Sequence, residues 1–150
     1  MWQGEVVSIH LVGQKGQPTA PVKQARAVPG KGLEGDRYYQ AGGAAPDRGA
    51  TLIEIESLEA LEREDQVQMA PGEARRQIVT RGVPLNHLVG VEFLVGEVRL
   101  RGMRLCEPCQ HLTDLTHPSV LRGLVHRGGL RAQILTEGVI RPGDPVSASK

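Results

Sequence analysis

The stretch VEFLVGEVRLRG, Val91–Gly102, contains two short apolar runs that are hinged at Gly96. The two runs read as a pair of strands joined by a tight turn. The 19 glycines and 10 prolines of the chain are spread evenly, which is typical of many short strands connected by turns. This stretch therefore predicts a domain that is mainly β.

The sequence on either side of this stretch continues the strand pattern. Gly4–Val12 and Pro21–Val28 read as strands, and Gly49–Glu56 reads as a buried strand. Leu130–Ser149 predicts two final strands around the turn signal of Arg141–Asp144.

Two segments read as short helices. Ser57–Glu64 has leucines at helical spacing and acidic residues elsewhere, and Thr116–Gly129 has Pro118 in its first turn and Gly128 near its end. We find no linker, repeat or low-complexity stretch. The prediction is a single domain over residues 1–150, barrel-like and mainly β with a few short helices.

Composition excludes several classes of function. The formal net charge of +1 gives no general attraction to nucleic acid. No apolar run approaches the roughly 20 residues that a membrane span needs, so no membrane partner is expected. The segment after Met1 leads directly into a strand pattern, so no signal peptide is expected. With 2 cysteines and no disulfide framework, we expect a cytoplasmic protein.

Both cysteines lie in RLCEPCQHL, Arg104–Leu112, as a C-x-x-C of Cys106 and Cys109. A structural zinc site needs four ligands, so histidines would have to complete it. The nearest histidines in the sequence are His111, His117 and His126. Their spacing matches no common zinc finger, so no zinc is expected.

Two other chemistries remain for the thiols. A redox pair requires its first cysteine at a helix N-terminus, whereas the residues before Cys106 read as a strand. A presented thiolate is favoured by Arg101 and Arg104, because nearby cations lower the pKa of a thiol. Two small buried residues at a strand end remain the plainest alternative.

Arginine far outnumbers lysine, and the arginines occur in short groups. The groups are Arg75, Arg76 and Arg81; Arg99, Arg101 and Arg104; and Arg122, Arg127 and Arg131. The planar fork of arginine binds phosphate in a bidentate manner. A thiol together with several arginine–glycine turns indicates an anionic, phosphorylated ligand that is presented to sulfur.

Four segments in order resemble the MOSC domain, the module named for the C-terminal part of molybdenum cofactor sulfurase. The loop GKGLEGDRY, Gly30–Tyr38, resembles the family's Gly-Leu-x-Gly-Asp-Arg motif. Ala74–Leu100 resembles its Arg-Arg-Asn-Ile-Val segment and the following hairpin, Leu105–Leu112 its cysteine motif, and His126–Val146 its closing segment.

The resemblance implies a MOSC-type β-barrel-like fold, similar to the β-barrel domain of pyruvate kinase. It also implies binding of the molybdenum cofactor, or carriage of sulfur, on the cysteine that follows proline, which is Cys109. Cys106 is then a spectator or a resolving thiol. Some members of the family reduce N-hydroxylated compounds, and others are fused to desulfurases, so pyridoxal phosphate would belong to a partner.

The resemblance also suggests roles for individual residues. Arg75 and Arg81 would contact the phosphate or pterin of the cofactor, and Gln77 and Asn86 would orient it. The opposite wall would be lined by Arg127 and Arg131. Asp36 and Arg37 are expected to hold their own loop together. Gln77 stands where relatives have asparagine, which moves the amide outward by one methylene.

Two other functions stay open at this level. The chain can be a non-catalytic sulfur-trafficking module that docks to a pyridoxal phosphate-dependent cysteine desulfurase, or a C-x-x-C thiol-redox protein. As an enzyme it would be a molybdenum cofactor-dependent oxidoreductase or a sulfur transferase, and an electron-donor protein would then be a partner.

Overall fold

The computed structural model describes residues 2–14, 16–107, 123–124 and 126–149. The strands are β1 Gln3–Leu11, β2 Ala20–Val22, β3 Ala25–Val28, β4 Gly32–Leu33, β5 Ala50–Glu54, β6 Ile78–Arg81, β7 Glu92–Val95, β8 Val98–Leu105, β9 Leu130–Ile134, β10 Gly138–Ile140 and β11 Pro145–Ala148. The helix α1 is Ile55–Asp65, and the 3-10 helices are η1 Pro46–Arg48, η2 Pro71–Ala74 and η3 Leu85–His87.

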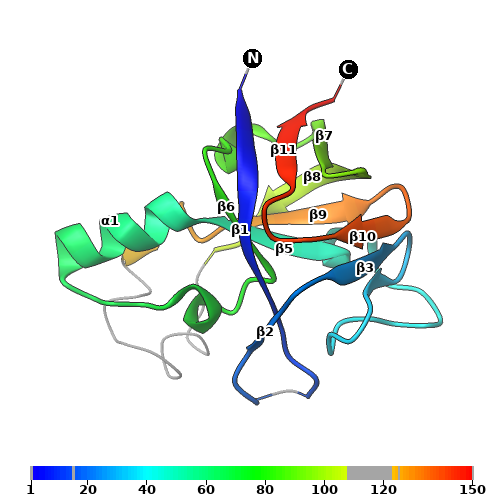
Figure 1. Ribbon diagram of the computed structural model, residues 1–150, viewed down its shortest axis with the longest axis horizontal. Coiled ribbons are helices and arrows are strands. Elements are labelled where there is room, and N and C mark those ends of the chain that lie inside the picture. The colour runs from blue at the N-terminus through cyan, green and yellow to red at the C-terminus, as the bar shows by residue number, and fades with distance from the viewer. Residues whose placement is uncertain (1, 15, 108–122, 125, 150) are drawn as a thin grey trace.

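The main sheet closes into a barrel. Its strand order is β11-β7-β8-β9-β5-β6-β1-β2, and β11 also pairs with β1, so seven strands form a ring that leaves β2 outside. The pairing of β5 with β6 is parallel, and the other pairings within the ring are antiparallel. This closure confirms the predicted β-barrel. Because β1 pairs with β11, the two ends of the described chain lie side by side (Figure 1).

Strand alternation divides the apolar residues between two clusters. Leu52 of β5 and Ile78 of β6 face the barrel interior with Phe93 and Leu100, and none of these four side chains is exposed. The neighbouring residues Ile53 and Val79 face outward and pack under α1 with its buried leucines. Strands β5 and β6 therefore contribute one face to the barrel interior and the other face to the contact with α1.

The hairpin of the opening stretch forms as predicted. Gly96 has a φ of 58° between β7 and β8, in the left-handed region that glycine adopts without strain. The predicted strand at Pro21–Val28 is wrong in one respect, because it is broken between β2 and β3, which join different sheets. Leu130–Ile140 is broken in the same way, into β9 and β10.

One strand boundary differs from the expectation, and one strand is additional. The strand predicted to extend to Glu56 ends at Glu54, because α1 begins at Ile55. Strand β6 was not predicted. Most of the helix expected over Thr116–Gly129 lies outside the described residues. Cys109 lies wholly outside them.

Across the described part of the chain, no helix has the length and apolar character that a membrane crossing requires.

Candidate functional site

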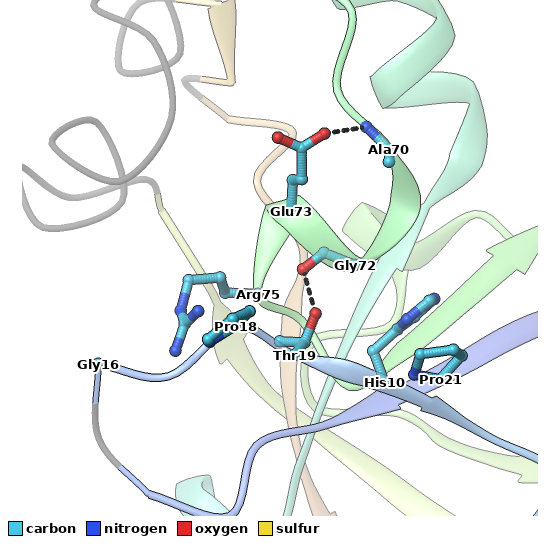
Figure 2. A pocket seen from close by; sticks show the side chains of 9 residues that line it. All are labelled: His10, Gly16, Pro18, Thr19, Pro21, Ala70, Gly72, Glu73 and Arg75. Atoms are coloured by element: carbon cyan, nitrogen blue, oxygen red, sulfur yellow. Dashed lines mark hydrogen bonds between the residues drawn. The ribbon is translucent and has the colours of Figure 1, made fainter.

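Two adjoining chambers lie beside the end of β1. The smaller chamber has a volume of about 150 Å³ and the larger chamber about 490 Å³. His10, Thr19 and Arg75 line both, so they form the boundary between the two. The larger chamber is drawn in Figure 2.

The smaller chamber is rich in arginine. Arg37, Arg75, Arg76 and Arg131 all line it, from segments that are spread along the sequence. Arg131 comes from β9, where it lies opposite Thr51 of β5. Such a concentration of guanidinium groups in one small cavity favours an anionic ligand.

Arg75 occupies an unusual backbone conformation at the end of η2. Its φ is 58°, and its N–H donates to the Gly72 carbonyl at 3.1 Å. A residue other than glycine in the left-handed region often marks a functional position. Burial, and then the neighbouring charge of Arg37, lower the pKa of the Arg75 guanidinium. Both effects disfavour the cation, so an anion in the chamber would stabilise it.

Two guanidinium nitrogens in the smaller chamber are buried without a hydrogen-bond partner among the described residues. They are Nη2 of Arg75 and Nε of Arg37. Nη2 of Arg37 donates a hydrogen bond to the Tyr38 hydroxyl. The guanidinium carbon of Arg37 lies 4.3 Å from the centroid of the Tyr38 ring. Leaving a buried donor unsatisfied costs about 1–3 kcal/mol, so each nitrogen favours a ligand acceptor.

A buried polar network forms the floor of the smaller chamber. The Asp36 carboxylate accepts the backbone N–H of Val12 at 2.9 Å and the Gln77 side-chain amide at 2.8 Å. The side-chain carbonyl of Gln77 accepts the backbone N–H of Thr51 at 2.9 Å, and the Thr51 hydroxyl accepts the backbone N–H of Gln77 at 3.0 Å. Asp36 also accepts the N–H of Tyr38, so it holds its own loop and also ties that loop to the barrel.

Gln77 is therefore a positioning residue in this structure. The residue is only 6% exposed, and the two ends of its side-chain amide are bound to Asp36 and Thr51. The additional methylene relative to asparagine lets one side chain span the gap between these two partners.

Arg76 also lines the smaller chamber, but its guanidinium group binds backbone carbonyls. It is 8% exposed, and its Nε donates to the Gly128 carbonyl at 2.8 Å. Its Nη2 donates to the carbonyls of Cys106 and Glu107 at 3.2 and 3.3 Å. The end of β8 is thus fixed to the residues that lead into β9.

Cys106 lies in the wall of the smaller chamber. It is 3% exposed, and its N–H donates to the Gly129 carbonyl at 2.7 Å. Cys109, His111 and His117 lie outside the described residues. Within the described ranges no three histidine, cysteine or acidic side chains are grouped as metal ligands. His126 instead pairs with Glu107, with 3.0 Å between Nδ1 and the carboxylate.

Of the described residues proposed from the sequence, Arg75, Gln77 and Arg131 meet at the smaller chamber. The other three proposed residues do not line either chamber. Arg81 lies 3.5 Å from Glu59 of α1, Asn86 donates to the His126 carbonyl at 2.6 Å, and Arg127 lies 3.0 Å from Glu64.

Sequence reasoning missed the residues that join the two chambers. His10 is half-buried on β1, where its Nε2 lies 2.8 Å from the Ser8 hydroxyl, and burial lowers its pKa. Thr19 precedes β2, and its hydroxyl donates to the Gly72 carbonyl at 2.7 Å. Neither residue belongs to a recognisable motif. Only the alternation along β1, which puts His10 on the face opposite Ile9, offered a signal.

The fold is a closed β-barrel with an arginine-lined chamber beside the end of β1. A family model described as the MOSC domain matches residues 39–147. The chain therefore belongs to the MOSC domain family.

Solved structures share this fold at low sequence identity. The YuaD protein from Bacillus subtilis superposes with a TM-score of 0.83 at 15% identity, and 100% of each chain is covered. YiiM from Geobacillus stearothermophilus has a TM-score of 0.77 at 17% identity, covering 98% of this chain and 75% of that one. YiiM from Escherichia coli has a TM-score of 0.68 at 17% identity, covering 97% and 70%. No curated protein was found to be similar to the chain.

Proposed function

We propose that this chain binds the molybdenum cofactor, with the phosphate of the cofactor in the smaller chamber, and that Cys109 holds molybdenum or carries sulfur. The observation that carries the proposal is the pair of buried, unpartnered nitrogens on Arg75 and Arg37, within the part of the chain that the structure describes. A phosphate offers several acceptor oxygens and a negative charge, so it satisfies both donors and offsets the repulsion between the two cations.

The size of the site is consistent with the cofactor. Small-molecule sites usually enclose about 300–1,000 Å³. The smaller chamber, at about 150 Å³, holds only a phosphate-sized group, whereas the adjoining larger chamber, at about 490 Å³, has room for a ring system. The two together fit a ligand with a charged end and a flat, bulky end.

The described residues have defined parts in this function. The phosphate of the cofactor is held by Arg75, Arg37 and Arg131. The hydrogen-bond network around Asp36 keeps the walls of the smaller chamber in place. Arg76 fixes the backbone at Glu107, immediately before the segment that contains Cys109. When bound, the cofactor supplies a two-electron redox centre, and thiolate is a soft ligand suited to such a metal.

The test compares protein from a host that makes the cofactor with protein from an otherwise identical host that does not. We expect molybdenum and a fluorescent oxidised pterin, in matching amounts, only from the first host. Cys109→Ser should lose molybdenum, and Cys106→Ser should keep it. Reduction of N-hydroxylated bases by the loaded protein, given an electron donor, would identify it as an oxidoreductase.

A different result would favour the sulfur-trafficking function. In that case neither host yields molybdenum, while a cysteine desulfurase with bound pyridoxal phosphate transfers sulfur to Cys109 as a persulfide. If both single cysteine variants lose function and the wild type forms an internal disulfide, the C-x-x-C redox function replaces both.

A further inference from the structure

The polar groups of the two chambers differ in kind. The smaller chamber is lined by four guanidinium groups, which only donate hydrogen bonds, and by the carboxylates of Asp36 and Glu107. Both carboxylates already have partners, because Asp36 accepts from Gln77 and Glu107 pairs with His126. The larger chamber is lined by proline, alanine and glycine, by His10, Thr19 and Arg75 at the boundary with the smaller chamber, and by Glu73, whose carboxylate lines the larger chamber alone. A ligand that spans both should therefore have acceptors at one end and donors at the other.

Glu73 and Thr19 are left as acceptors by their own hydrogen bonds. One oxygen of the Glu73 carboxylate accepts the Ala70 N–H at 2.8 Å, so within the described part of the chain the second oxygen remains for a ligand. The Thr19 hydroxyl donates its proton to the Gly72 carbonyl at 2.7 Å, so only its lone pairs remain. Figure 2 shows both bonds, with the two side chains on either side of Gly72.

The remaining walls suit a flat ring. Pro18, Pro21 and Ala70 give rigid apolar surfaces without donors or acceptors on their side chains. Thr19 and His10 pack closely against Gly72, because a Cβ at that position would lie 2.6 Å from the Thr19 hydroxyl oxygen and 2.9 Å from Nδ1 of His10. His10 can present either a donor or an acceptor, according to its tautomer.

We propose that the larger chamber binds the pterin ring of the cofactor, with Glu73 and Thr19 accepting hydrogen bonds from its 2-amino group and adjacent ring N–H. This inference rests on the proposed function, and it fixes the orientation of the ligand: phosphate toward Arg75 and Arg37, pterin toward Glu73. Glu73 is then the residue that determines specificity for an aminopteridine over an oxopteridine.

The test uses two probes that differ at a single position. Pterin carries an amino group at ring position 2, and lumazine carries an oxygen there. Both are fluorescent, so their binding to the cofactor-free protein can be followed by titration. Because a carboxylate accepts from the amino group and repels the oxygen, we expect pterin to bind about tenfold more tightly than lumazine.

Glu73→Gln isolates the role of the carboxylate. Its carbonyl oxygen can still accept the Ala70 N–H, while the second oxygen becomes an NH₂ donor, so we expect the preference for pterin to disappear. Glu34→Gln is the matched control, because Glu34 is an exposed residue 4.0 Å from Arg26 and outside both chambers. Gly72→Ala should weaken both probes equally, since its methyl group would push Thr19 and His10 into the chamber.

The outcomes separate this inference from the proposed function. Equal binding of the two probes to the wild type, or a preference that survives Glu73→Gln, would overturn the assignment of the pterin to the larger chamber. Molybdenum loading in the cofactor-producing host would stand in either case. Conversely, a pterin preference that depends on Glu73 in a chain that never takes up molybdenum would support the pterin site and contradict the proposed function.

Discussion

At the scale of single residues, the adjacent arginines Arg75 and Arg76 have different tasks. The left-handed backbone at Arg75 lies between η2 and β6, and both side chains line the smaller chamber. Arg75 keeps a buried nitrogen available for a ligand, whereas Arg76 directs its donors to backbone carbonyls. We therefore expect Arg75 to bind the ligand, whereas Arg76 stabilises the local backbone.

Replacement of Arg76 should therefore reduce stability. Arg76→Ala leaves the carbonyls of Gly128, Cys106 and Glu107 without their donor, and we expect a loss of roughly 3 kcal/mol in the free energy of unfolding. Urea denaturation gives this value. Arg63→Ala is the control, because that side chain is 71% exposed and should change stability by less than about 0.5 kcal/mol. Equal midpoints for the two variants would contradict the role of Arg76.

The sequence could place only part of the site. Arg75, Gln77 and Arg131 were proposed from motif and charge, and all three line the smaller chamber. Arg81 was grouped with Arg75 by proximity in the sequence, yet the length of β6 carries it to the opposite end of the strand, beside α1. Two arginines that are close in the sequence can lie far apart when a strand runs between them, as β6 does between Arg75 and Arg81.

At the scale of elements, the junction of β5 and α1 concentrates acidic groups. Glu54 ends the strand, and Glu56 lies in the first turn of the helix. Burial, and then the charge of Glu56, raise the pKa of Glu54. The ionised carboxylate is therefore disfavoured in the folded protein relative to the unfolded chain.

This junction predicts a pH-dependent effect of Glu54→Gln. A carboxyl with a raised pKa destabilises the fold once it ionises, so the penalty appears as pH rises through the ordinary glutamate pKa of about 4.3 toward the raised value in the folded state. The variant should melt at a higher temperature than the wild type at pH 7, and the difference should vanish near pH 4. An unchanged difference at both pH values would show that the carboxylate is not the cause.

A close backbone approach in β8 supports a second prediction at this scale. A Cβ on Gly102 would lie 2.0 Å from the Leu88 carbonyl oxygen, which belongs to the backbone and cannot rotate away. Gly102→Ala should cost at least about 2 kcal/mol, measured by chemical denaturation. Gly42→Ala is the matched control, since a Cβ on Gly42 would have nothing within 4 Å, and it should leave stability almost unchanged. A similar small effect for both would contradict the close approach.

The strongest patterns in the sequence predicted their elements well, and the weakest did not. The hairpin around Gly96 has two apolar runs and a glycine with positive φ, so local sequence determines it. Strand β6 has only four residues and follows two arginines, and its pairing with β1 and β5 is decided by distant parts of the chain. The helix start at Ile55 was missed because an isoleucine fits a strand as readily as a first helical turn.

At the scale of the whole molecule, ring closure brings the site together. His10 lies near the end of β1 and Val12 just beyond it, Thr51 belongs to β5, Gln77 precedes β6, and Arg131 lies on β9, so the walls come from different parts of the barrel. No single segment of sequence contains the site. The family resemblance could name the fold, but the division into a cationic chamber and a larger apolar one required the three-dimensional structure.

Cofactor binding at the smaller chamber is tested most directly with Arg75→Gln and Arg127→Gln, each purified from a host that makes the molybdenum cofactor. Both changes remove one guanidinium charge, but only Arg75 lines the smaller chamber, while Arg127 lies 3.0 Å from Glu64. Molybdenum and pterin per chain are measured on folded protein with matched melting temperatures. We expect Arg75→Gln to retain less than about a tenth of the cofactor held by the wild type, because it loses a charge-assisted contact. We expect Arg127→Gln to load normally. Normal loading of Arg75→Gln, or equal losses in both variants, would contradict cofactor binding at the smaller chamber.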